Sequence, residues 1–243
     1  MHIRLLPYAI ADGATNMAND DVLARSAAAG VASLRFYAWS AATVSLGYFQ
    51  PHADVRAHSR LADLPWVRRP SGGATLVHHH ELTYALALPS GSPWRSGEPW
   101  MLHMHRIIVT ALAELGLDQK IVLVDDRPVK HGDVLCFQQF TVGDVLCAGR
   151  KIVGSAQRKY HQALMQHGSI LLSQSEHTPE LPGIRELTGV ALSADQVRDS
   201  ILRQFEKSTG WELKRSEWTT EAAACIRKMR EERYLSVDWN ERR

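Results

Sequence analysis

CFQQFTVGDVLCAGRKIVGSAQRK, residues 136–159, is the stretch on which the interpretation of this chain depends. It opens on Cys136, and Lys151 stands shortly before the small residues 154–156. The runs DVLCAG and KIVGSAQRKY predict a hairpin around Gly149, because a glycine separates two β-rich segments. The chemistry of the stretch is open at this point: either Cys136 is a nucleophile, or Lys151 carries the function and the cysteine is a bystander.

The remainder of the chain mixes β-rich runs with amphipathic segments. Strands are predicted in the following runs: the N-terminal segment, SLRFYAWS, ATVSLGYF, three runs within 66–90, and ALMQHGSILL. Helices are predicted over 16–30 (with Asn16 or Asp20 near its N-terminal cap), 55–64, 98–117, and, late in the chain, about 194–208 and 219–234. Because strands rarely alternate with helices, the pattern favours an α+β fold with a largely antiparallel sheet.

Composition narrows the class of protein. The chain has 243 residues, 45% hydrophobic and 22% charged, which is typical of one globular domain with a buried core. The net charge of +2 argues against general nucleic-acid binding but permits a local basic patch for an acidic partner. No apolar run approaches the roughly 20 residues of a membrane helix, and we interpret the N-terminus as a strand rather than a signal peptide. Three cysteines without metal-site spacing indicate a reduced, cytoplasmic protein.

RRPSGG, residues 68–73, combines arginines with glycines at the end of a predicted strand. Glycines let backbone amides approach a ligand, and arginine binds carboxylates or phosphates. The competing interpretation is a plain hairpin turn with solvent-facing arginines.

A run of three histidines follows at positions 78–80. Neighbouring strand residues point to opposite faces, so the three cannot all bind one ion from a regular strand. We therefore predict no metal site here, and expect one inward histidine with two on a turn.

Lys151 and Cys136 can each also be interpreted as residues without a catalytic role. Lys151 belongs to a basic strand and could be a surface residue, since arginines and a lysine cluster nearby. A lone free cysteine is more often a buried small hydrophobe than a nucleophile, unless a cation lies near the thiol. Residue types alone leave both alternatives open.

The whole chain resembles the superfamily of lipoate–protein ligase A, octanoyltransferases and biotin ligases. The resemblance rests on motifs in the family's order: NMANDD, LRFYAWS with VSLGYFQ, RRPSGGATLVHHHELTY, the 136–159 stretch and QHGSILL. It implies a fold like a class II synthetase or biotin protein ligase core, with a mixed, mostly antiparallel sheet flanked by helices. It also implies one catalytic domain over 1–243, with C-terminal helices from about 194 and no ligase accessory domain.

The resemblance assigns catalytic roles to Cys136 and Lys151. It assigns substrate-binding positions to the glycine hairpin, the small-residue run and the next strand: Arg69, Ser71, Gly72, Gly73, His78, Gly154, Ser155, Ala156, His167 and Gly168. Cysteine-type octanoyltransferases place their nucleophile fifteen residues before the site lysine, and here 151 − 136 = 15. Two departures, Ala74 and His79, fall on the nucleotide side of the expected pocket and weaken the ligase alternative.

The implied enzyme is an acyltransferase of lipoate biosynthesis. It would move an octanoyl group from acyl carrier protein to a lysine of a lipoyl-domain protein, such as glycine cleavage H protein or 2-oxoacid dehydrogenase E2, through a cysteine thioester and without a cofactor. One alternative is a lipoate–protein ligase that uses ATP and Mg²⁺. The other is a non-catalytic acyl- or lipoyl-domain-binding module.

Overall fold

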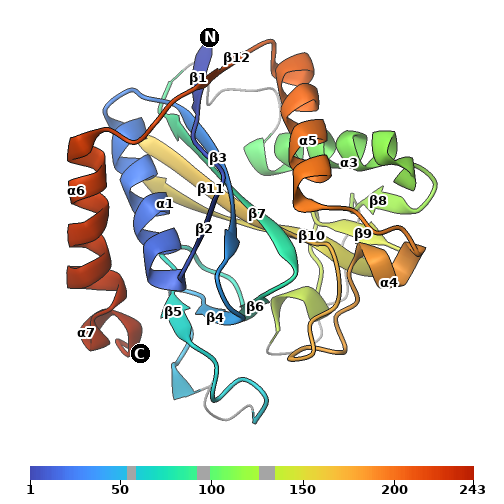
Figure 1. Cartoon of the computed structure of the whole chain (residues 1–243), viewed down its shortest axis with the longest axis horizontal. Helices are drawn as coiled ribbons and strands as arrows, with labels where there is room; N and C mark the ends of the chain where they lie inside the picture. The colour runs from blue at the N-terminus through green and yellow to red at the C-terminus, as the bar shows by residue number, and fades with distance from the viewer. Residues whose placement is uncertain (54–58, 92–98, 126–134) are drawn as a thin grey trace.

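The computed structural model describes residues 1–53, 59–91, 99–125 and 135–243. A large mixed sheet forms its centre, with helices on both faces and a small second sheet below one end (Figure 1). The order of the large sheet is β12-β1-β3-β7-β11-β10-β9-β8, with β2 paired to β3. The small sheet has the order β5-β4-β6.

The strands of the large sheet are β1 (His2–Leu5), β2 (Ala9–Ala11), β3 (Ser33–Trp39), β7 (Glu81–Pro89), β8 (Ile121–Leu123), β9 (Val145–Cys147), β10 (Arg150–Tyr160), β11 (Ala163–Leu171) and β12 (Glu212–Arg215). Those of the small sheet are β4 (Thr43–Leu46), β5 (Trp66–Arg68) and β6 (Leu76–His78). Pairing from β3 through β7, β11, β10 and β9 to β8 is antiparallel throughout. The α+β class and the largely antiparallel sheet are therefore confirmed.

The helices are α1 (Gly13–Ala28), α3 (Trp100–Leu112), α4 (Ile184–Thr188), α5 (Ala194–Thr209), α6 (Thr220–Met229) and α7 (Val237–Asn240). Two short π-helical segments, η2 (Ala113–Leu117) and η4 (Arg230–Tyr234), and one 3₁₀ helix, η3 (Cys136–Gln138), complete them. The predicted helix over 98–117 matches α3 and η2 from Trp100 onward, while residue 98 lies outside the described residues. Gly116, with φ 90°, ends it in a conformation that suits glycine. Within the described residues, no helix is long and apolar enough to cross a membrane.

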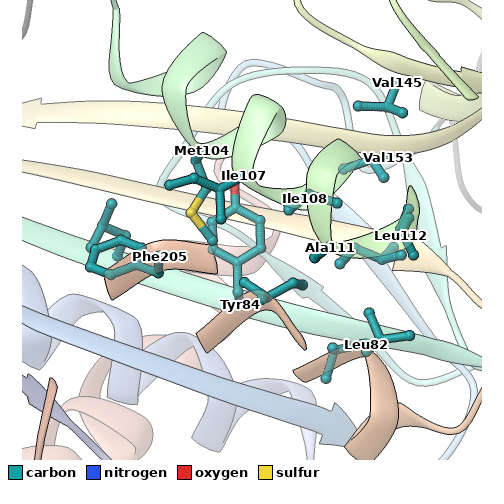
Figure 2. Close-up of a cluster of buried hydrophobic side chains, with 14 of the residues drawn as sticks. Leu82, Tyr84, Met104, Ile107, Ile108, Ala111, Leu112, Val145, Val153 and Phe205 are labelled. Carbon is teal, nitrogen blue, oxygen red and sulfur yellow. The ribbon is translucent and has the colours of Figure 1, made fainter. Parts of the chain in front are cut away.

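Alternating side chains of β7 build the core on the two faces of the sheet. Leu82 and Tyr84 pack against α3 and α5, where Met104 and Phe205 lie (Figure 2). The intervening alanines of β7 belong to a second cluster, formed with α1 and Tyr234. The small residues let α1 approach the sheet closely. This central strand is buried on both faces.

Two details of the predicted secondary structure were wrong. Asp12, not Asn16 or Asp20, caps the first helix, because the helix begins a turn earlier than expected and Asp12 Oδ1 accepts from the Thr15 amide at 2.7 Å. The helix expected over 55–64 is not formed at 59–64, which are turns, while 54–58 lie outside the described residues.

Candidate active site

A cavity of about 70 Å³ opens between β3, the glycine hairpin, η3, β10 and β11. Apolar walls come from Met17, Trp39, Leu76 and Phe137. Most of the residues expected to bind substrate line it as well: Arg69, Gly73, His78, Gly154, Ser155, Ala156, His167 and Gly168, together with Cys136. The tertiary structure thus gathers segments nearly 100 positions apart around a space that suits an aliphatic group.

Lys151 lies beside Cys136, which lines this cavity. The Lys151 Nζ is 3.8 Å from the Cys136 Sγ, within hydrogen-bonding distance for sulfur. The amide of Cys136 donates to the carbonyl of Thr75 at 2.7 Å, so the glycine hairpin holds η3 in place. The register of β10 shifts just after Lys151, and such irregularities re-aim a side chain. The arrangement places a cation against a half-exposed thiol.

Asp144 completes this group, and sequence analysis missed it. Its Oδ2 lies 2.8 Å from the Lys151 Nζ, and both side chains are buried. The same oxygen accepts from the amide of Thr141 at 2.7 Å, which fixes the carboxylate. The ammonium of Lys151 therefore has one anionic partner and one sulfur partner. The only sequence feature that pointed to Asp144 is its position just before β9, the strand that pairs with the Lys151 segment of β10.

Gly154 provides the space in which Lys151 lies. A Cβ at position 154 would stand 2.5 Å from the Lys151 Cε and 2.9 Å from its Nζ. Contacts under 3.0 Å do not occur for real Cβ atoms, so another residue here would displace the lysine. Gly168 plays a similar part on β11, because its Cβ would meet the Ser155 Oγ at 2.1 Å.

A buried polar chain stands behind His167. The Ser71 Oγ is 2.5 Å from the His167 Nε2, and the His167 Nδ1 is 3.0 Å from an oxygen of Asp20. The ring of His167 thus bridges the Ser71 hydroxyl and the Asp20 carboxylate. Asp20 in turn accepts from Arg35 at 3.1 Å and from Tyr37 at 3.0 Å. Asp20 and Arg35 belong to quoted motifs, but neither was predicted as part of the site.

His78 is fixed from both ring nitrogens. Its Nδ1 lies 2.6 Å from Glu81, and its Nε2 lies 2.7 Å from the hydroxyl of Ser45. The ring stacks on Trp39 with the centroids 3.8 Å apart. Burial lowers the pKa of His78, although Glu81 opposes the shift, so the ring is neutral. This confirms the expectation of one inward histidine, with residues 79–80 on the turn between β6 and β7.

Glu81 is fully buried and ionised. Burial by itself would raise the pKa of Glu81. The His78 ring and the hydroxyls of Thr83 and Ser169 outweigh burial, so the pKa lies below its usual value. One of its oxygens accepts from these groups, and the other has no hydrogen-bond partner among the described residues.

Arg69 supports the glycine hairpin rather than projecting freely. Its guanidinium donates to the carbonyls of Gly72 and Ala74 at 3.0 and 2.6 Å, and to the carbonyl of Ser45 at 2.9 Å. Burial lowers the pKa of Arg69, and a thiolate at Cys136 would oppose that shift. Arg69 therefore shapes the hairpin beside the cavity, with Gly73 at φ 96°.

A further buried network reaches the cavity at Ser155. The His105 Nδ1 donates to the Gly143 carbonyl, and its Nε2 accepts from the Ser155 hydroxyl at 2.6 Å. Tyr84 lies 2.7 Å from the same hydroxyl and accepts from Gln166 at 2.6 Å. Burial lowers the pKa of His105 and raises the pKa of Tyr84 to about 12. Both rings are neutral, and their hydrogen bonds fix the orientation of Ser155.

Known proteins resemble this chain along its length. The curated octanoyltransferase LipM of Kyrpidia tusciae is 29% identical, and the alignment covers 99% of this chain and 98% of the relative. Among solved structures, a candidate lipoate protein ligase of T. acidophilum superposes with a TM-score of 0.82 at 20% identity, covering all of both chains. The archaeal bipartite lipoate protein ligase from Thermoplasma acidophilum gives 0.73 at 21% identity, over 99% and 96%.

These likenesses confirm the expected fold and the suspected relationship. The model of the lipoyl protein ligase A/B catalytic domain matches residues 12–179, the part of the chain that contains every expected site residue. This chain belongs to the lipoyl protein ligase A/B catalytic domain family.

Proposed function

We propose that this protein is an octanoyltransferase of lipoate biosynthesis that works through a thioester on Cys136. The observation that carries the proposal is the contact of 3.8 Å between the Lys151 Nζ and the Sγ of Cys136, a residue that lines an apolar cavity. A full-length relative named an octanoyltransferase supports it. Covalent catalysis also suits two large substrates, because donor and acceptor need not bind together.

In the first step, the Cys136 thiolate attacks the carbonyl carbon of octanoyl-acyl carrier protein. The carbon–sulfur bond to the carrier breaks, a new one forms to Cys136, and the carrier thiolate takes a proton from solvent. The Lys151 ammonium donates to the thiolate before attack and faces the charge that develops on the carbonyl oxygen. Asp144, fixed by Thr141, holds the ammonium in that place.

In the second step, the ε-amine of a lipoyl-domain lysine attacks the acyl-enzyme. An amide bond forms, the thioester breaks, and the proton lost by the nitrogen returns to the Cys136 sulfur. The octanoyl chain occupies the apolar cavity, which Ser155, His167 and Gly168 help to line. No cofactor enters either step, because a thioester is already activated.

A lipoate–protein ligase is the second candidate, and the superposition on a lipoate ligase of T. acidophilum favours it. Such an enzyme would use ATP and Mg²⁺ to form lipoyl-adenylate before transfer. It would need no thiol, so the nearness of Cys136 to Lys151 supports the transferase. Either enzyme would modify a lipoyl domain in the cytoplasm.

The deciding experiment is the intact mass of the purified protein after incubation with octanoyl-acyl carrier protein in the absence of ATP. We expect an octanoyl adduct on Cys136 that disappears when apo lipoyl domain is added. Cys136→Ala should form no adduct, while Cys225→Ala, a half-buried cysteine of α6 outside the cavity, should behave like the wild type.

Full transfer by Cys136→Ala would refute the thioester. Modification of the lipoyl domain only with lipoate and ATP, in wild type and variant alike, would establish the ligase.

A further inference from the structure

Two tight turns meet outside the cavity and bring histidines together with a carboxylate. One turn is residues 79–80, between β6 and β7. The other is residues 176–177, closed by the bridge between Ser175 and Thr178 in the segment after β11. Sequence spacing argued against a metal site within 78–80 alone, but it could not place the second turn.

We propose that His79, Glu176 and His177 form a binding site for a zinc-class divalent metal ion, with His80 as an additional donor. One ligand atom from each of the first three lies within 4.8 Å of the others. The site is separate from the proposed transfer chemistry, which uses Cys136 and Lys151.

The separations lie close to those of tetrahedral coordination, although each of His79 and His177 contacts a different oxygen of Glu176. Zinc bonds of about 2.0–2.1 Å place neighbouring donors about 3.3–3.4 Å apart. The His79 Nδ1 lies 3.4 Å from one Glu176 oxygen, and the His177 Nε2 lies 3.6 Å from the other. The His80 Nε2 is 3.9 Å from Glu176. Small side-chain adjustments would bring these atoms around one ion.

The backbone holds the turns in this arrangement without an ion. The carbonyl of His80 accepts from the amides of Leu172 and Ser173 at 3.0 and 3.2 Å, which joins the first turn to the start of the second segment. The hydroxyl of Ser175 accepts from the His177 amide at 3.2 Å, which fixes the second turn. It also lies 3.1 Å from the His79 Nδ1, so an ion on that nitrogen would replace this contact. A preorganised site loses little conformational entropy on binding.

The donor set selects the class of metal. Imidazole nitrogens with a carboxylate suit zinc, cobalt, nickel and copper, whereas Mg²⁺ and Ca²⁺ prefer oxygen ligands. Glu176 is 68% exposed on its side chain and the histidines are partly exposed, so an ion can enter from solvent. The ordinary alternative is a set of surface histidine–carboxylate ion pairs.

A bound ion would also connect to the cavity through the chain. Residues 79 and 80 stand between His78, which lines the cavity, and Glu81, which holds the His78 ring. An ion would tie this short turn to the segment after β11. We therefore expect zinc to stabilise the fold against heat.

The test uses full-length protein without a histidine tag. Zinc binding is measured by calorimetry, and cobalt binding by the visible absorption typical of tetrahedral sites. We expect one ion per chain and a higher unfolding temperature with zinc. His177→Gln and Glu176→Gln should each weaken zinc binding by about 10–100-fold or more, because the loss of a group that only supports a metal ligand already costs that much affinity. His161→Gln, at an exposed histidine of the turn between β10 and β11, is the matched control.

Zinc binding by the Cys136 thiol is distinguished from binding at the two turns by repeating the titration on Cys136→Ser, which should still bind one ion. Unchanged affinity in His177→Gln and Glu176→Gln, or loss in Cys136→Ser alone, would place the ion elsewhere and overturn the proposal. Absence of stoichiometric uptake by the wild type would leave only surface ion pairs at the two turns and would equally overturn it.

Discussion

Replacement of Gly154 by alanine tests how the active site is built, because the change adds one methyl group and removes no functional group. The new Cβ would stand 2.5 Å from the Lys151 Cε and 2.9 Å from its Nζ. The lysine is the more flexible partner, so it must leave its place beside Cys136 and Asp144. We expect Gly154→Ala to separate the ammonium from the thiol while the sheet stays intact.

Two magnitudes follow. Forcing an extra carbon into a packed interior costs about 1–3 kcal/mol of folding free energy. Loss of one preorganised electrostatic donor lowers catalytic rates about 10²–10³-fold. Because Lys151 is the only donor that the methyl group displaces directly, the rate of Cys136 acylation should fall by about 10²-fold or more. Unfolding stability should fall by this packing cost and by the cost of leaving the buried Asp144 carboxylate without its cation, about 3–5 kcal/mol for a broken buried pair.

The assay is single-turnover formation of the octanoyl adduct, followed by mass spectrometry, beside urea unfolding of the same samples. A double-mutant cycle supplies the control: in a Lys151→Ala background, Gly154→Ala should change the acylation rate little, since the group it displaces is gone. Equal losses in both backgrounds would show that the methyl group acts by another route. A Gly154→Ala enzyme with unchanged acylation would refute the assigned role of Lys151.

Three further predictions concern stability, each measured by urea unfolding. Burial lowers the pKa of His105, so below about pH 6.5 the unfolded chain takes up a proton that the folded chain does not. The contribution of His105 to stability is therefore fully present above that pH. On acidification the free energy of unfolding should fall by up to about 1.4 kcal/mol per pH unit for this group. His105→Gln should reduce the slope by one proton, and an unchanged slope would contradict the assignment. Asp20→Asn leaves the buried Arg35 without its anion and should cost about 3–5 kcal/mol, whereas a loss below about 1 kcal/mol would show that Arg35 is neutralised elsewhere. Ser193→Ala removes the side-chain cap of α5 and should cost about 1 kcal/mol, with no loss if the cap is not formed in solution.

The elements that sequence analysis placed correctly depend on neighbours along the chain. The hairpin around Gly149 is one: Cys147 pairs with Arg150, and Ala148 and Gly149 both have positive φ, as a two-residue hairpin turn requires. The helix over 98–117 is another, since its apolar residues recur at helical spacing. Both patterns are local in the sequence. The strand β12 was missed because its pairing partner, β1, lies at the other end of the chain.

The sequence by itself determined the family, the fold class and the pair of residues proposed for the chemistry. The order of the motifs and the spacing from Cys136 to Lys151 can be read directly from the amino-acid sequence. Only the tertiary structure decided what surrounds that pair. Asp20 meets His167 across 147 positions, and Glu176 meets His79 across two separate turns. Such partners depend on which strands adjoin and how far a side chain reaches. No local pattern of residue types specifies either quantity, so the supporting polar groups emerge only once the chain has folded.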